Sequence, residues 1–185
     1  MITQLLALLC ALLLAGCAGA GTTSPQASPE GGADASGRGA TAPSGEPGVL
    51  QPSEGFAVAD VTFTDEETSV VMPVLVADNA DLRATGLMRR TDLPVDAGML
   101  FVFDVPTTGA FWMKNTLLPL SIAFVGQDGI VQQLIDMDPC VADPCPRYAP
   151  DDPYVYAVEV NQGFFGDRGI TGGWTLDVAD ALGGA

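Results

Sequence analysis

The sequence predicts a mainly β domain, an antiparallel β-sandwich or barrel with one short helix, preceded by a signal peptide and a disordered linker. Residues 56–185 contain several short runs of apolar, β-branched and aromatic residues separated by Gly, Pro, Asp and Asn, which is typical of strands and turns. Only one segment of this domain has apolar residues at helical spacing. Residues 18–55 have almost no aliphatic side chains and no periodicity, so they cannot offset the entropy of ordering.

The N-terminal residues are predicted to direct export and to anchor the protein to a membrane. Residues 2–16 are uncharged and mostly apolar, a run shorter than the roughly 20 residues that span a bilayer and typical of a secretory signal peptide. The run ends in Leu14-Ala15-Gly16-Cys17, which resembles the bacterial lipobox and implies cleavage before Cys17 and lipid on its sulfur. Only Met1 precedes the run, without the usual Lys or Arg, which leaves open a start further upstream.

These features divide the chain into three parts. We expect a lipoprotein signal peptide over residues 1–16, a lipidated cysteine and Gly/Ser/Pro/Ala-rich linker over residues 17–55, and a globular domain over residues 56–185. The predicted location is extracytoplasmic, in the cell envelope, with the membrane as partner through the lipid on Cys17.

Composition excludes several function classes. The formal net charge is −16, whereas nucleic-acid binding requires a basic surface, so no nucleic-acid partner is expected. The chain has no histidine, which excludes Ser-His-Asp and Cys-His catalysis and imidazole metal ligands. No cofactor is predicted.

The elements of the domain follow from local patterns. Pro73 suggests that its strand is an edge strand or carries a bulge. Asp128-Gly129, between two apolar runs, predicts a hairpin. The helix is predicted to begin at Asp78 as N-cap, with Gly86 marking either a weak helix or a close approach. The predicted strands cover residues 56–63, 69–77, 98–103, 120–125, 130–137, 154–160 and 174–178.

Cys140 and Cys145 are predicted to form a disulfide, because they flank a proline-stiffened loop and the domain is expected in an oxidising compartment. A metal site would need more ligands than two thiolates, and the spacing is not the Cys-x-x-Cys of redox pairs. The sequence leaves open whether the disulfide shapes a loop beside the functional site or only holds a surface loop together.

The segment Phe111–Thr116 is predicted to line the functional site. It joins two aromatic residues, a thioether and three polar groups, and it contains Lys114, the only lysine of the 185 residues. Arg and Lys side chains in an acidic domain favour an anionic ligand, and an aromatic wall favours an apolar pocket. The methionines at 88, 99 and 113 are predicted to fill the core. The candidate ligand-binding residues are Arg83, Arg90, Trp112, Lys114, Asn115, Thr116, Glu159 and Asn161.

The ordered motifs resemble a known family. Gly86-Leu87-Met88, Phe111–Thr116, Pro119-Leu120 and Glu159-Val160-Asn161, with the spacing between them, resemble the conserved-region family called domain of unknown function 192. The resemblance implies a largely β, often exported protein and supplies no reaction. Where the family usually has Pro-Leu-Asp, this chain has Ser121, which could not replace a catalytic carboxylate. Where the family usually has a Gly-Asp turn, the chain has Gly172-Gly173-Trp174.

Several functions remain open. We favour a non-catalytic module that binds a small polar or anionic ligand or an envelope partner, with no catalytic residue assigned. The alternative is a lysine-dependent enzyme with Lys114 as base or nucleophile, with or without Ser121. A structural alternative is a buried ion pair, of Lys114 with Glu159 or of an arginine with a carboxylate, that only fixes the packing of the strands. Calcium binding by the acidic residues at 136, 138, 143, 151 and 152 is less favoured, because their spacing matches no EF-hand.

Overall fold

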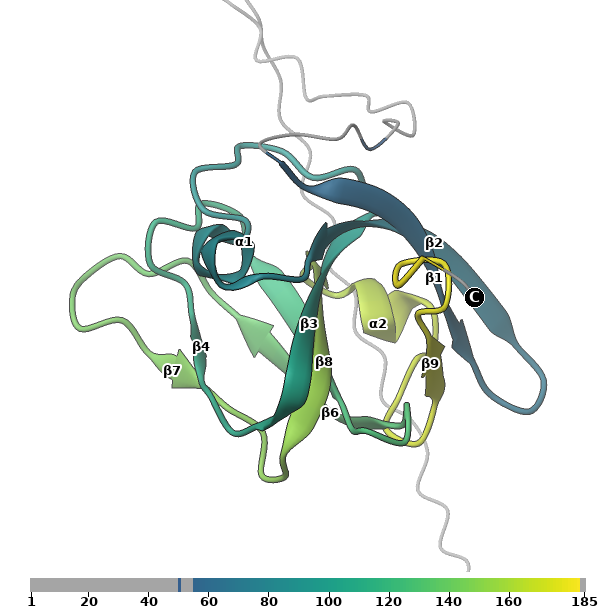
Figure 1. The fold of residues 1–185 in the computed structure, drawn as a ribbon. Coiled ribbons are helices and arrows are strands. Elements are labelled where there is room, and N and C mark those ends of the chain that lie inside the picture. Colours follow the sequence, from purple (N-terminus) through teal and green to yellow (C-terminus); the bar gives the residue numbers. More distant parts are fainter. Residues whose placement is uncertain (1–49, 51–54, 184–185) are drawn as a thin grey trace, which may run out of the picture. The chain divides into compact units, whose positions relative to one another are not determined.

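The computed structural model describes residue 50 and residues 55–183, and it confirms a mainly β domain. The predicted signal peptide, the lipidated Cys17 and nearly all of the linker lie outside these residues. No helix in the described part is long and apolar enough to cross a membrane. The elements, shown in Figure 1, are β1 (Ala57–Thr64), β2 (Ser69–Ala77), α1 (Ala80–Thr85), β3 (Gly98–Thr107), β4 (Phe111–Trp112), β5 (Leu120–Val125), β6 (Val131–Met137), β7 (Arg147–Tyr148), β8 (Tyr154–Asn161), α2 (Phe164–Asp167) and β9 (Thr175–Asp177).

Seven strands form one curled, half-barrel sheet in the order β6-β5-β8-β3-β2-β1-β9, and β4 pairs with β7 in a separate two-stranded sheet. The large sheet is mixed: β2 and β3 are parallel, and the other pairs are antiparallel. Parallel neighbours require a long crossover, and residues 78–97 with α1 supply it. This crossover places α1 beside the sheet.

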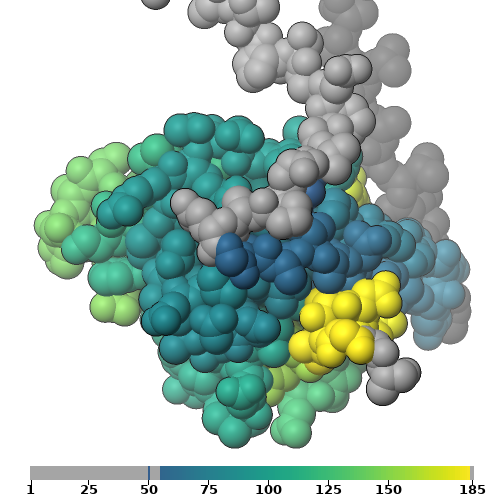
Figure 2. All heavy atoms as spheres, turned by 45° about the horizontal axis from the view of Figure 1, so that its top comes forward, coloured from purple at the N-terminus to yellow at the C-terminus, as the bar shows by residue number. Residues whose placement is uncertain are grey.

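The C-terminal segment links the two ends of the sheet. β9 pairs with β1 at one edge, and the yellow C-terminal segment lies against the dark blue β1–β2 region in Figure 2. At the other edge, Thr175 forms a bridge with Ile130, and the backbone of Val131 exchanges hydrogen bonds with Gly173 and Trp174. Pairing at both edges curls the sheet and leaves less of β6 available for other strands.

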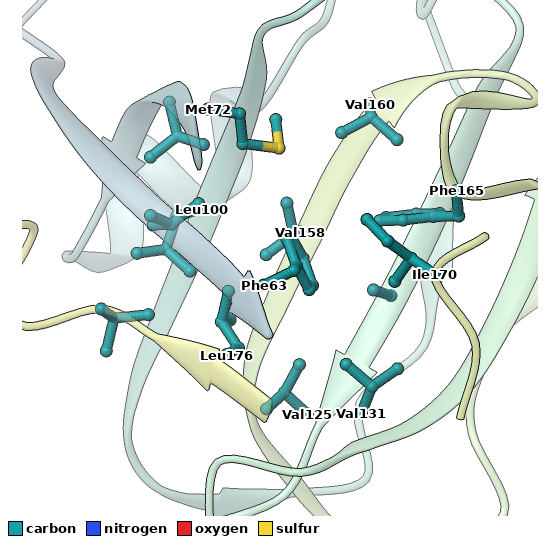
Figure 3. Close-up of a cluster of buried hydrophobic side chains, with 14 of the residues drawn as sticks. Phe63, Met72, Leu100, Val125, Val131, Val158, Val160, Phe165, Ile170 and Leu176 are labelled. Atoms are coloured by element: carbon teal, nitrogen blue, oxygen red, sulfur yellow. The ribbon is translucent and has the colours of Figure 1, made fainter. Parts of the chain in front are cut away.

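The two faces of the large sheet carry separate hydrophobic clusters, because successive strand residues point to opposite faces. One cluster joins the sheet to α2 and the C-terminal segment, and Figure 3 shows Phe63, Val158 and Phe165 within it. The other cluster contains Met99, Ile122 and Ala157, beneath α1 and the 111–116 segment. Met99 and Met113 are buried there, as expected of core filler, whereas Met88 is partly exposed.

Local details show why the elements begin and end where they do. Asn79, not the predicted Asp78, caps α1: its Oδ1 accepts a hydrogen bond from the Leu82 amide at 3.0 Å. The prediction from Pro73 was wrong, because β2 lies between β1 and β3 and pairs with β1 without a bulge. Pro73 precedes the first β2 residue paired with β3, so its missing N–H leaves no gap in that ladder. Gly86 ends α1 with a φ of 49°, a backbone conformation that favours glycine. A Cβ there would lie 3.5 Å from the Phe101 ring, which is an ordinary contact distance, so the backbone conformation and not a close approach accounts for the glycine.

Candidate functional site

A cavity of about 310 Å³ lies between α1, the turn that follows it, the β4–β7 pair and one face of the large sheet. Four of the eight candidate residues line it: Arg83, Trp112, Thr116 and Glu159. Apolar side chains complete the wall, namely those of Leu87, Met88, Phe101 and Phe111. A concave, largely apolar site with a few polar groups has the properties of a small-molecule pocket.

Glu159 is the buried polar group of this cavity. It lies on β8 between Met99 of β3 and Ile122 of β5, so its side chain belongs to the face that carries the second hydrophobic cluster. Only 5% of the residue is exposed, and no described residue makes a hydrogen bond or ion pair with its carboxyl group. Burial in this apolar setting raises the pKa of Glu159 to about 8, because the charged form loses its water.

Arg83 is held in place by the backbone. Its Nη1 donates to the carbonyl oxygens of Asp78 at 2.9 Å and Val102 at 2.7 Å, and its Cζ lies 5.0 Å from the centroid of the Phe103 ring. These bonds use only one of the two terminal nitrogens. The rest of the guanidinium group is therefore left for a ligand in the cavity that Arg83 lines.

Arg147 is a lining residue that sequence reasoning missed. In the β4–β7 pair it lies opposite Trp112, and its Cζ lies 4.7 Å from the indole centroid, a cation–π distance. The Lys114 Nζ lies 5.5 Å from the same indole. A strand of two residues has no periodic pattern, so only the proximity of Arg147 to the predicted disulfide could have pointed to it.

The charge distribution at this cavity is unusual. Six of the seven basic residues of the chain lie in the described part, and Arg83, Lys114 and Arg147 are all near Trp112. Within residues 55–183, neither Arg83 nor Arg147 forms an ion pair, although the net charge is −16. By contrast, Arg168 pairs with Asp96. Two guanidinium groups therefore line the cavity without an ion-pair partner among the described residues, and Glu159 is the one acidic residue in that lining.

A second hollow of about 170 Å³ adjoins the disulfide loop. Cys140 and Cys145 form the disulfide, and Lys114 and Asn115 line the hollow together with the loop. The Lys114 side chain is 43% exposed and its Nζ lies 3.9 Å from Asp143. Lys114 therefore pairs with the loop rather than with Glu159, unlike the structural alternative raised by the sequence.

The remaining candidates lie elsewhere. Asn161 donates from its Nδ2 to the carbonyl oxygens of Leu93 and Pro94, both at 3.1 Å, and so supports the segment before β3. Arg90 lies on the turn after α1 and is not among the residues that line the two cavities. The structure thus brings together four candidates in the larger cavity and two in the smaller hollow.

Ser121 lies on the opposite face of the sheet from Glu159. It is 2% exposed, its Oγ donates to the Asp136 carboxylate at 2.5 Å, and it accepts a hydrogen bond from the Gly163 amide at 3.0 Å. These buried contacts fix β5 to β6 and to the start of α2, and they do not form a Ser-Lys pair with Lys114. Asp136 provides a carboxylate beside the position where the family was expected to have one.

The acidic residues after β6 do not form a metal site. Among residue 50 and residues 55–183, no group of three or more Cys, Asp or Glu side chains is arranged to hold a metal ion. Asp138 accepts a hydrogen bond from Gln162, and Asp143 lies near Lys114. These contacts are typical of a solvated acidic surface.

Comparison with known proteins places this geometry in a family. Residues 61–178 match the family model DUF192, described as "Uncharacterized ACR", and this range includes every residue of the larger cavity. A comparison with curated proteins found no match.

Two solved structures are similar to the chain. A protein of unknown function from Novosphingobium aromaticivorans DSM 12444 is 30% identical with a TM-score of 0.64, covering 72% of this chain and 94% of that protein. A protein from Sinorhizobium meliloti 1021, described as a "putative transcription regulator", is 27% identical with a TM-score of 0.61, covering 68% of this chain and 97% of that protein. Both are therefore similar in fold to this domain.

Proposed function

Since the chain belongs to the DUF192 family, which carries no assigned reaction, we propose a function from the site: a module that binds a small organic anion in the 310 Å³ cavity. The regulator description of the Sinorhizobium protein is not carried over, because a net charge of −16 disfavours contact with nucleic acid.

The observation that carries this proposal is the pair of arginines at the cavity. Arg83 and Arg147 form no ion pair with the described carboxylates, in a protein with 23 acidic residues. Arg83 is fixed by two backbone carbonyls and Arg147 is stacked on Trp112. Such pre-positioned guanidinium groups lose little entropy on binding a carboxylate or phosphate, and they can form paired, charge-assisted hydrogen bonds.

The apolar lining of the cavity indicates what the ligand carries besides its anionic group. Phe101, Phe111, Leu87 and Met88 offer apolar surface, so an anion with a small apolar body gains from burial. The volume is at the small end of the roughly 300–1,000 Å³ of ligand pockets, which favours a molecule the size of a substituted benzoate or a short fatty acid.

Arg147→Gln is expected to weaken binding of such an anion by about tenfold or more, because hydrogen bonds to charged groups contribute roughly 1.5–3 kcal/mol. The measurement is calorimetric titration with para-ethylbenzoate and hexanoate, supported by thermal shift. Arg89→Gln removes the same charge from an exposed residue outside the cavity lining and is the matched control. Equal affinities for the two variants, or no binding to the unsubstituted protein, would exclude the proposed function.

The same proposal includes a location. The leader at residues 1–16, the lipobox-like Leu14–Cys17 and the spacer to residue 55 support export and a lipid anchor, and a disulfide suits an oxidising compartment. Cys17→Ser is expected to abolish incorporation of an alkyne-labelled fatty acid and to move the protein from the membrane to the soluble fraction. Labelling that persists in the variant would contradict the assignment of Cys17.

Lysine-dependent catalysis, the alternative, has less support. A nucleophilic or basic lysine is usually activated by desolvation, whereas the Lys114 side chain is 43% exposed and lies near Asp143. The proposed function therefore assigns Lys114 no chemical step.

A further inference from the structure

Glu159 is not accounted for by the binding of an anion alone. It lines the same cavity as Arg83 and Arg147 and bears the opposite charge when ionised. Only 5% of the residue is exposed, and no described residue is hydrogen bonded to its carboxyl group. Among the described residues no fully buried side-chain oxygen lacks a partner, so the Glu159 carboxyl oxygens are open to the cavity. A ligand that fills the cavity would remove the remaining solvent from this carboxyl group, so binding is favoured when the ligand supplies a hydrogen-bonding partner in its place.

The surroundings of Glu159 offer it no internal partner. Its neighbours on the adjoining strands are Met99 and Ile122, whose side chains have no hydrogen-bond donor for a carboxylate. The cavity lining also contains the hydroxyl groups of Thr85 and Thr116. The Thr85 hydroxyl donates to the Asp81 carbonyl oxygen at 2.9 Å, and neither hydroxyl is hydrogen bonded to Glu159. The other ionisable side chains of the cavity lining are Arg83 and Arg147, which stay charged at all pH values of interest.

We propose that the cavity takes a dipolar ligand, with a protonated amine that pairs with Glu159, an anionic group that pairs with Arg83 and Arg147, and a short apolar segment between them. This inference rests on the proposed function and adds the second polar end of the ligand. The carboxyl group of Glu159 and the guanidinium groups of Arg83 and Arg147 then bind opposite ends of the same ligand.

Binding of a dipolar ligand is expected to change the number of protons bound to the protein, which can be measured. Burial raises the pKa of Glu159 to about 8, so in the free protein at neutral pH the carboxyl group is mostly protonated. An ammonium group pairs with the ionised form, so its arrival moves the Glu159 proton to the buffer and forms an N–H to carboxylate ion pair. Binding of a dipolar ligand should therefore release up to about one proton and tighten as the pH rises from about 6 to 8.

The test compares para-(aminomethyl)benzoate with para-ethylbenzoate, which has the same shape without the amine, and δ-aminovalerate with hexanoate as a flexible pair. Calorimetric titration of the full protein at about pH 8 is expected to show the amine-bearing probe binding about tenfold more tightly. At about pH 7, titration in two buffers of different ionisation enthalpy should show proton release for the amine-bearing probes only.

The variant Glu159→Gln should lose both the preference for the amine-bearing probe over para-ethylbenzoate and the proton release. If that variant does not fold, the pH and buffer series on the unsubstituted protein still shows whether the amine-bearing probes bind more tightly and release a proton. Equal or tighter binding of para-ethylbenzoate, or proton uptake on binding, would overturn the dipolar ligand and leave the proposed function intact. Binding of no probe would overturn both.

Discussion

Glu159→Gln is expected to remove most of the pH dependence of the free energy of unfolding between about pH 4.5 and pH 8. The folded state holds the Glu159 proton up to about pH 8, whereas the unfolded chain releases it near the ordinary value of 4.5. Between these values the folded state binds more protons, so the stability of the unsubstituted protein falls as the pH rises. Glutamine cannot ionise, so this contribution disappears in the variant.

The expected loss of unfolding free energy follows from the raised pKa of Glu159. A raised pKa of about 8 against 4.5 corresponds to a loss on the order of 4 kcal/mol across this range, a large fraction of the stability of a small domain. Urea unfolding at about pH 5 and about pH 8.5 measures it for the protein and the variant. Glu66→Gln, at an exposed turn residue, should leave the slope unchanged. Parallel pH profiles for the protein and Glu159→Gln would show that the Glu159 carboxyl group has a partner or water.

Gly98→Ala is expected to destabilise the fold by about 3 kcal/mol or more, although alanine is a conservative replacement. A Cβ at residue 98 would lie 2.5 Å from the Glu159 carbonyl oxygen and 2.9 Å from the Met72 Cε. The nearer atom belongs to the backbone of β8, which pairs with β3 and β5 and cannot move without disturbing both.

The matched control is Gly166→Ala in α2, where a Cβ would meet nothing within 4 Å. Thermal unfolding of both variants measures the difference, and only Gly98→Ala should lower the melting temperature by several degrees or more. A melting temperature close to that of the unsubstituted protein would mean that β3 and β8 are further apart than the structure has them.

Much of the fold could be predicted from the sequence because most strands are long enough to carry a pattern. Residues 69–77 and 120–125 are strands with the predicted bounds, and the Asp128-Gly129 hairpin forms between β5 and β6. The elements that were missed are short: β4 and β7 have two residues each and α2 has four. The parallel β2–β3 pair was also missed, because strand direction depends on the crossover rather than on residue pattern.

The candidate site was only partly predictable for a related reason. Glu159, Thr116 and Trp112 stood out as polar or aromatic residues in the motifs, and they do share a cavity with Arg83. Lys114 stood out by its rarity, but it points to the disulfide loop. Arg147 reaches the cavity only because β7 pairs with β4, a contact between distant segments that no local pattern encodes.

The crystal structure of the protein with para-ethylbenzoate tests most directly whether the cavity of Arg83, Arg147 and Glu159 is the binding site. We expect the carboxylate to lie within hydrogen-bonding distance of Arg83 and Arg147 and the ring to pack against Phe111 and Trp112. A benzoate bound beside Lys114 and the disulfide loop, with the larger cavity empty, would contradict it.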